Sequence, residues 1–445
     1  MYHPELDILS RDVTMNVKVL AIVAVVIVVA AGGGAAILLM KDDGDSKYRS
    51  SDLSGRLAVF GNANNDDYLD DEDLELVGKI IAGTEDKAKY PFADANNDGN
   101  VNDADREIIQ KMINREEMDI KYLNGNKEVK TVGYPIKRAV VVGTNATMTM
   151  QAIGAVTAKK IVGVTGEASK DTYLFSDVMD LPKVSTSIIA ADFDKVQEIG
   201  NVDAIITMAS ASYLKNEATF TGAGIDVVRI SSSDGLEAVS VALTMGYLFQ
   251  LEDRANDYAK LCDDVLSYIS DKVKNVTTEN QKSILCMTMT NYVSGIPSDY
   301  YELTVMVGGK NLADWNTTTQ RFNAGDEWLL VDKYHADVML HYHQYSYSPD
   351  YYKSTEQKAM YEEYQGYFAK TQTVKDGHYC LMNSNMPAIV RLAYTASILY
   401  PDIYGADYGD EIHQKYVDGF LDNLSSINYD VTKVKFILTD DVFKS

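Results

Sequence analysis

The feature that most constrains the fold is an alternation of strand-like and helical stretches that begins near Val129. Five short apolar runs come first: "RAVVVGT", "KIVGVTG", "KVSTSI", "VDAIITMAS" and "IDVVRISS". Helical stretches such as "NATMTMQAIGA" lie between them. Apolar strands separated by helices are typical of a parallel sheet that is covered on both faces. The alternation therefore predicts an α/β fold.

A helical region over residues 236–276 interrupts this alternation. Its apolar residues lie on one helical face before Glu252 and on another after it, which predicts two helices with a break at that point. The alternation then restarts with "SILCMTMT", "YELTVMVGGKNL", "HADVMLHYH" and "GHYCLMN". We therefore expect two Rossmann-like lobes, over about 129–235 and 277–445, joined by a long helix.

The N-terminal part contains an uncharged apolar segment at residues 19–40. As a helix it is long enough to span a hydrocarbon core of about 30 Å. Basic residues precede it and acidic residues follow, so the positive-inside rule places residues 1–18 in the cytoplasm and the rest outside. A cleaved signal peptide is the alternative, although its apolar region is normally only about 7–15 residues long. We expect a single-pass membrane anchor, a linker over 41–55 and an extracellular or periplasmic chain.

The stretch "DANNDGNVNDAD" has the ligand spacing of a calcium loop. Calcium takes about six to eight oxygen ligands, so alternate side chains must turn towards one centre. Gly99 stands sixth, where such a loop turns sharply. The expected ligands are Asp94, Asn96, Asp98, Asn100 through its carbonyl group, Asn102 and Asp105.

The same pattern occurs earlier, in "NANNDDYLDDED". Its expected ligands are Asn62, Asn64, Asp66, Tyr68 through its carbonyl group, Asp70 and Asp73. An asparagine stands first and Asp67 replaces the glycine, so we expect this calcium site to be the weaker of the two. A pair of solvated acidic turns is the alternative interpretation.

Each loop runs into an apolar helical stretch, and the repeat falls within residues 56–120. This duplication resembles a dockerin module, and the aspartate at position twelve of both loops fits that family. The resemblance implies a small all-α calcium-binding module and a cohesin domain as a possible protein partner.

Four stretches between Lys137 and Val431 resemble, in order, a substrate-binding protein of the ABC importers for cobalamin, ferric siderophores and haem. They are "KRAVVVGTNATMTMQAIGAVTAKKIVGVT", "DFDKVQEIGNVDAIIT", "VMVGGKNLAD" and "MPAIVRLAYTASILYPDIYG". The family's proline before the "VDAIIT" strand is missing here. The resemblance implies a receptor that delivers a metal chelate to an ABC permease and is not an enzyme. A net charge of -24 also disfavours nucleic-acid binding.

The resemblance implies a ligand cleft between the lobes, where loops follow strand ends. Lobe 1 would offer Thr144, Asn145, Ser210, Ser212 and Tyr213, the first two at a helix N-terminus suited to an anionic group. Lobe 2 would offer Tyr292, Trp315, His341, Tyr342, His343, Tyr345, Asn383 and Met386. His341 and His343 would share one side of a strand and could ligate a metal centre; otherwise they lie exposed on a loop.

In this family each lobe also carries an acidic residue that meets arginines of the permease. The matching residues are Asp194 and Glu327. The alternative is that both only favour the start of a helix, by about 0.3–1 kcal/mol. A second function is also open at this point: a cell-surface protein that binds cohesin and whose two-lobed domain is not engaged in transport.

Overall fold

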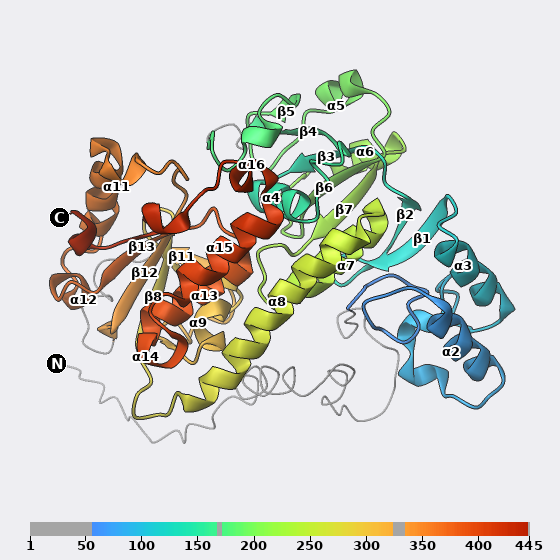
Figure 1. Cartoon of the computed structure of the whole chain (residues 1–445), viewed down its shortest axis with the longest axis horizontal. Helices are drawn as coiled ribbons and strands as arrows, with labels where there is room; N and C mark the ends of the chain where they lie inside the picture. Colours follow the sequence, from blue (N-terminus) through green and yellow to red (C-terminus); the bar gives the residue numbers. More distant parts are fainter. Residues whose placement is uncertain (1–55, 167–170, 324–333, 444–445) are drawn as a thin grey trace, which may run out of the picture.

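The computed structural model describes residues 56–166, 171–323 and 334–443. The predicted cytoplasmic segment 1–18, anchor 19–40 and linker 41–55 lie outside the described residues, as does Glu327. Figure 1 shows two α/β lobes side by side, a long helix passing along both, and a small module against lobe 1. None of the described helices is long and apolar enough to cross a membrane.

Lobe 1 is built on a five-stranded sheet of order β5-β4-β3-β6-β7, whose paired strands all run parallel. The strands are β3 (Ala139–Val142), β4 (Ile161–Thr165), β5 (Lys183–Ser185), β6 (Ala204–Met208) and β7 (Asp226–Ile230). The helical segments are α4 (Thr144–Ala152), η5 (Ser176–Val178), α5 (Phe193–Ile199) and α6 (Glu217–Gly222). Every residue of β3 and β6 is buried, as expected for central strands covered on both faces. The predicted α/β fold is confirmed.

Lobe 2 has a mixed sheet of order β11-β9-β8-β12-β13-β14, with β10 paired to β8. The strands are β8 (Ser283–Thr288), β9 (Tyr292–Ser294), β10 (Lys310–Asn311), β11 (Arg321–Asn323), β12 (Val338–His343), β13 (Tyr379–Asn383) and β14 (Ile437–Leu438). The pairs of β8 with β10 and β12, and of β12 with β13, are parallel; β9, β11 and β14 pair antiparallel.

Helices cover both faces of this second sheet. They are α9 (Asp299–Met306), α11 (Thr355–Gly366), α12 (Gln372–Lys375), α13 (Ala388–Leu399), α14 (Pro401–Tyr404), α15 (Tyr408–Phe420) and α16 (Asp422–Ser425). Short 3-10 turns are η8 (Tyr351–Lys353), η9 (Val431–Lys433) and η10 (Asp440–Phe443). The stretch "YELTVMVGGKNL" thus forms the greater part of helix α9, which packs against α13, and then β10.

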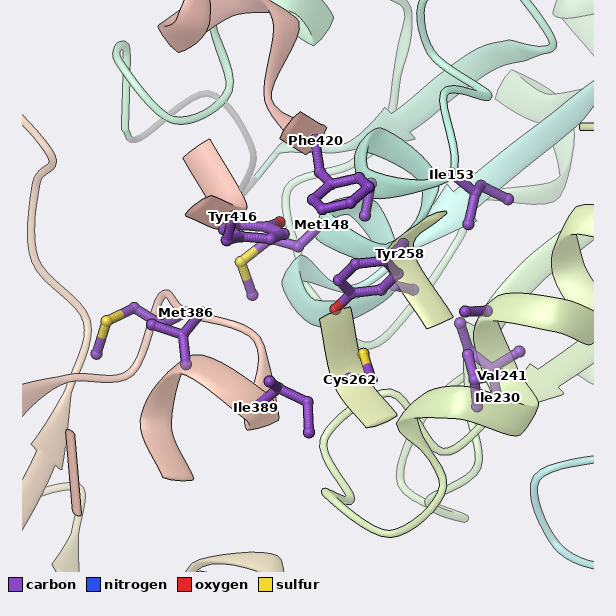
Figure 2. Close-up of a cluster of buried hydrophobic side chains, with 14 of the residues drawn as sticks. Met148, Ile153, Ile230, Val241, Tyr258, Cys262, Met386, Ile389, Tyr416 and Phe420 are labelled. Atoms are coloured by element: carbon purple, nitrogen blue, oxygen red, sulfur yellow. The ribbon is translucent and has the colours of Figure 1, made fainter. Parts of the chain in front are cut away.

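Two helices connect the lobes, as the sequence predicts: α7 (Ala238–Phe249) and α8 (Glu252–Lys272), followed by η6 (Val273–Asn275). The break falls at Gln250, whose backbone is left-handed at φ 52. Figure 2 shows Tyr258 and Cys262 of α8 packed among side chains of both lobes. The ring centroids of Tyr258 and Phe420 lie 5.1 Å apart. This shared core opposes large relative motion of the lobes, since packed interiors deform little.

The N-terminal module contains α2 (Asp71–Ile81), the turns η2 (Lys87–Lys89) and η3 (Pro91–Ala93), and α3 (Asp103–Ile113). Its own small core includes Val77, Ile80 and Ile109. An antiparallel hairpin of β1 (Met118–Leu123) and β2 (Val129–Tyr134) follows. The sequence places the first lobe from about Val129, whereas the structure puts Val129–Tyr134 in this hairpin and begins the lobe's sheet at Ala139.

Candidate ligand cleft and calcium loops

A cavity of about 840 Å³ lies between the two lobes. On the lobe 1 side it is lined by residues 208–212, which include the last residue of β6 and the loop after it. Ile230, the last residue of β7, and the following Ser231, Ser233 and Asp234 complete this side. Both segments follow carboxyl ends of parallel strands, where open α/β sheets generally bind ligands. The volume falls within the range of about 300–1,000 Å³ that is usual for small-molecule sites.

The lobe 2 side of the cavity consists of the start of α9 and the residues that precede it. The lining residues are Ile296, Pro297, Ser298, Asp299, Tyr301, Glu302, Val305 and Gln320. Ser298 caps α9 by accepting a hydrogen bond from the Tyr300 N–H. The cap fixes the first turn of α9 and so directs the carboxylates of Asp299 and Glu302 into the cavity region.

The hairpin turn of the N-terminal part also reaches the cavity, through Asn126. Next to it, Gly125 N–H donates to the Arg229 carbonyl at 2.8 Å, and Ser231 Oγ donates to the Gly125 carbonyl at 2.7 Å. A Cβ on Gly125 would lie 2.7 Å from the Ser231 nitrogen, so only glycine allows this approach. The turn of the β1–β2 hairpin therefore forms part of the cavity wall.

The cavity wall is acidic. Asp234 and Glu302, one from each lobe, both belong to the cavity lining. Burial raises the pKa of both groups; the charge of Glu237 adds to this rise at Asp234, and the charge of Asp234 adds to it at Glu302. The raised pKa of Glu302 favours its protonated form in the empty cleft.

Two cations lie close to the cavity, and each is matched by a carboxylate. Arg391 of α13 is fully buried; its Nη2 donates to the Ser233 carbonyl at 3.2 Å and its Nη1 lies 3.8 Å from Asp299 Oδ2. Lys127 of the hairpin turn forms an ion pair with Glu237. Arg391 and Lys127 therefore neutralise other carboxylates rather than Asp234 or Glu302.

The structure brings Ser210 and Ser212 into the cavity wall, their Oγ atoms 2.9 Å apart. Tyr213 lies next to them against Gly143, where an added Cβ would come within 2.8 Å of its ring. Tyr213 thus packs beside the N-terminus of α4, which begins at Thr144. Thr144 is buried and neither it nor Asn145 belongs to the cavity lining.

The lobe 2 residues predicted for the cleft lie elsewhere. His341 is fully buried on β12, and Tyr379 Oη lies 2.8 Å from its Nδ1 while the Met289 carbonyl contacts its Nε2. His343 lies on the same side of β12, as expected from strand alternation, and packs on Tyr364 at 4.4 Å between ring centroids. With both ring nitrogens engaged by the protein, His341 has none left for a metal, so we do not assign it to the cleft.

The remaining predicted residues of lobe 2 fall into two groups. Tyr342, Tyr345, Asn383 and Met386 are buried, and the Asn383 side chain bonds the backbone of Tyr345. Tyr292 and Trp315 are exposed, with Trp315 packed on Phe322. None of the six lines the cavity.

Sequence reasoning did not identify the cavity-lining residues at the end of β7 and at the start of α9. Ser231, Ser233 and Asp234 directly follow the run "IDVVRI", and the rule that selects polar residues after a strand also applies to them. The segment "IPSDYYE" carries a helix start signal, a serine followed by acidic residues. No pattern in the sequence shows that Asn126, which precedes lobe 1, reaches the cavity.

The two predicted calcium loops have closely similar hydrogen-bond frames. The aspartate at position twelve is fully buried in both loops, and its carboxylate accepts a hydrogen bond from the backbone N–H of position three. Asn64 N–H donates to Asp73 at 3.2 Å, and Asn96 N–H donates to Asp105 at 3.3 Å. The same carboxylate accepts the N–H of position nine at 2.9 and 2.8 Å. The loops are therefore a structural repeat and not merely two acidic turns.

The loops differ at positions one and six. In the second loop Asp94 accepts the N–H groups of Asp98 and Gly99 at 3.0 and 2.6 Å, with Gly99 at φ 94. In the first loop the Asn62 amide donates to the carbonyls of Leu57 and Asp66, and its buried Oδ1 has no hydrogen-bond partner. An oxygen atom left without a donor at a ligand position fits a cation.

Calcium at either loop would use mixed oxygen donors. Within the described residues no three His, Cys, Asp or Glu side chains are grouped so as to hold a metal ion by themselves. The asparagine amides and backbone carbonyls of the loops would supply the other oxygens, which suits calcium as a hard cation.

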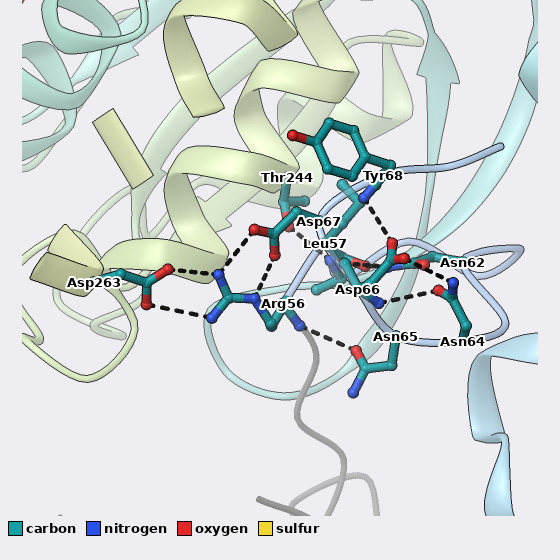
Figure 3. A network of polar contacts seen from close by, with 11 residues as sticks. Arg56, Leu57, Asn62, Asn64, Asn65, Asp66, Asp67, Tyr68, Thr244 and Asp263 are labelled. Atoms are coloured by element: carbon teal, nitrogen blue, oxygen red, sulfur yellow. Dashed lines mark hydrogen bonds and ion pairs between the residues drawn. The ribbon is translucent and has the colours of Figure 1, made fainter. Parts of the chain in front are cut away.

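Asp67, at position six of the first loop, is engaged outside the loop. It forms an ion pair with Arg56, and Arg56 in turn contacts Asp263 of α8 (Figure 3). The neighbouring Ala58 N–H donates to Thr244 Oγ1 at 2.9 Å, and Tyr247 Oη donates to the Met112 carbonyl at 3.2 Å. The module is thus packed onto α7 and α8.

Asp194 lies exposed in the first turn of α5. The capping role there belongs to Asp192, whose carboxylate accepts the N–H groups of Asp194 and Lys195. Asp194 is therefore not the cap of α5, and its side chain faces solvent.

Comparison with solved structures identifies the fold. A TroA-like periplasmic binding protein, FepB of Veillonella parvula, is 16% identical with a TM-score of 0.53, over 68% of this chain and 96% of that one. Helicobacter pylori CeuE, solved as a nickel–histidine complex, is 15% identical with a TM-score of 0.52, over 70% and 99%. The molybdate-binding protein MolA of Haemophilus influenzae is 14% identical with a TM-score of 0.52, over 68% and 97%.

No family model and no curated protein matches the sequence. The structural matches show that the two lobes have the fold of TroA-like periplasmic binding proteins.

Proposed function

We propose that this protein is a substrate-binding receptor that delivers a metal chelate, of the corrinoid, ferric siderophore or haem type, to an ABC importer. The observation that carries the proposal is the cavity of about 840 Å³ at strand carboxyl ends between two lobes of this fold. The solved structures with this fold that have bound nickel–histidine or molybdate support a metal-containing ligand. Nothing in this role calls for catalysis.

Isothermal titration of the full chain with a panel of corrinoids, ferric siderophores and haem tests this role. We expect saturable binding of one chelate per chain. Ser212→Tyr adds bulk to the cavity wall and should abolish binding, whereas Ser187→Tyr, an exposed change outside the lining, should not. A folded chain that binds no member of the panel would contradict the proposal.

We also propose that the loops at 62–73 and 94–105 bind calcium, the second more strongly. The repeated frame around Asp73 and Asp105 and the unpartnered Asn62 Oδ1 support this assignment. Calcium bound there would stabilise the module that packs on α7 and α8. Chelator-sensitive proteolysis of the module, described in the Discussion, is the test.

Delivery to a permease requires placement at a membrane and a docking face. The apolar segment 19–40 would serve as a single-pass anchor, with the lobes outside the cytoplasm. Asp194, exposed beside the capping Asp192, supports a docking contact on lobe 1, with Glu327 as its expected counterpart on lobe 2.

A second candidate function is docking onto a cohesin domain. The structural repeat of loop and helix in the module favours it, because it is the arrangement that the dockerin resemblance implies. Pull-down of the full chain by an immobilised cohesin domain, with and without calcium, would test it. Retention only with calcium would support docking, and no retention in either condition would remove this candidate.

A further inference from the structure

The charge of the cavity wall indicates what kind of ligand it accepts. Its described lining contains three carboxylates, Asp234, Asp299 and Glu302, and no lysine, arginine or histidine. Five serines supply hydroxyl groups: Ser210, Ser212, Ser231, Ser233 and Ser298. An anionic ligand would find hydroxyl donors there but no described countercharge on the wall itself, and would meet three carboxylates.

The carboxylates differ in how they are compensated. Asp299 lies 3.8 Å from the buried guanidinium of Arg391, and Glu237, just behind the wall, pairs with Lys127. Asp234 is held by the N–H groups of Leu236 and Glu237, which orient its carboxylate but carry no full charge. Among the described residues no cation is paired with Asp234 or Glu302, and the raised pKa of Glu302 favours its protonated form.

Asp234 belongs to lobe 1 and Glu302 to lobe 2, so a group between them touches both lobes at once. Cations interact strongly with carboxylates where water is partly excluded, and they need hydrogen-bond acceptors on more than one side. An ammonium or guanidinium group meets these conditions. A bare metal ion does not, because no three metal-ligating side chains converge within the described part of the chain.

We propose that the cleft selects a ligand that carries a cationic group and seats it between Asp234 and Glu302. This inference rests on the proposed receptor function and narrows its ligand class. The cationic group contacts both carboxylates, the serine hydroxyls bind the rest of the ligand, and the displaced proton of Glu302 passes to solvent. Chelates with an anionic periphery, such as haem and ferric catecholates, are disfavoured.

A simpler role for the pair would be a permanent tie between the lobes that the ligand never touches. The two roles differ in the proton balance of binding. If the cationic group displaces the proton of Glu302, binding releases that proton, and the affinity for the ligand rises with pH. A permanent tie keeps its proton, and binding is then independent of these two groups.

The test uses two chelate scaffolds whose charge varies at nearly constant shape. Ferrioxamine B, which carries an ammonium group, is compared with its neutral N-acetyl and anionic N-succinyl derivatives, and cationic aquocobalamin with neutral cyanocobalamin. Each is titrated calorimetrically into the full chain in buffers of different ionisation enthalpy, which gives affinity and protons released together. The variants are Glu302→Gln and, as a control of equal charge change, the exposed Glu198→Gln.

Within the scaffold that binds, we expect the affinity for the cationic member to be at least tenfold higher than for the other members. Binding of the cationic member should release a proton. Glu302→Gln should remove both the preference and the release, and Glu198→Gln neither. The inference is overturned if the anionic derivative binds equally or more tightly. It is also overturned if the cationic ligand is preferred without proton release and the preference survives Glu302→Gln. Either result leaves the receptor function standing. Failure of all five probes to bind the folded chain, together with no binding across the wider panel, contradicts the receptor function itself.

Discussion

The guanidinium of Arg56 lies 2.6 Å from the carboxylate of Asp263 and also pairs with Asp67 of the first predicted calcium loop. A single side chain thus connects that loop to α8, the helix along which both lobes pack. Hydrogen bonds from Ala58 to Thr244 and from Tyr247 to Met112 extend the same contact. The N-terminal module is therefore packed as a fixed part of the two-lobed body.

Removing this connection should loosen the module. Asp263→Asn leaves the half-buried Arg56 with one carboxylate, and we expect the free energy of unfolding to fall by about 1 kcal/mol. Asp264→Asn is the matched control, because its exposed carboxylate pairs with Lys260 one helical turn away. Urea unfolding measures both; equal effects of the two substitutions would show that the Arg56 contact contributes nothing.

Calcium should order the module, because it relieves repulsion among the loop carboxylates and its binding energy adds to folding energy. Limited proteolysis of residues 56–117 should therefore be faster with chelator than with calcium. Asp98→Ala should raise the cleavage rate in calcium more than Asp66→Ala, since the second loop has the complete ligand set. The calcium assignment fails if cleavage is equally fast in both conditions.

His341 should matter for stability and not for ligand affinity. Its buried ring is hydrogen-bonded to Tyr379 and Met289, so His341→Gln loses two buried contacts and should cost about 1–3 kcal/mol. Chelate affinity should stay within a factor of two. A large loss of affinity in a variant of normal stability would restore His341 as a ligand residue. His335→Gln, an exposed change, is the control.

The stabilising effect of His341 should also depend on pH. Burial lowers its pKa from 6.5 to about 4. Between these values the unfolded chain binds a proton that the folded chain does not, so this histidine's contribution is complete above pH 6.5 and is lost as pH falls towards 4. The stability difference between wild type and His341→Gln should therefore shrink from pH 7.5 to pH 5. A difference that is constant over this range would contradict the burial effect.

Permease docking should depend on Asp194 and Glu327. Reversing both, as Asp194→Lys with Glu327→Lys, should lower uptake in a reconstituted transporter while chelate affinity stays unchanged, because charges at the rim of an interface mainly steer association. Asp192→Ala is a control that removes the side-chain cap of α5 and keeps the exposed carboxylate of Asp194. Normal uptake by the double variant would limit both residues to a helix-terminal role.

Sequence patterns were sufficient for the lobes because apolar runs such as Ala139–Val142 and Ala204–Met208 report burial directly. They also located Ser210 and Ser212, which directly follow a strand. They failed where tertiary packing decides: His341 was expected to line the cleft, yet it is buried and contacts Tyr364 of α11. Asn126 was inaccessible to sequence reasoning, since only the folded hairpin brings it to a cavity formed by residues far along the chain.

The location of the bound metal tests the central claim most directly. Crystals of the full chain grown with the tightest-binding iron or cobalt chelate would give an anomalous peak at that metal. We predict the peak inside the interlobe cavity, between residues 208–212 of lobe 1 and Ser298–Glu302 of lobe 2. A peak beside His341 and His343, or a chelate bound outside the cavity, would contradict it.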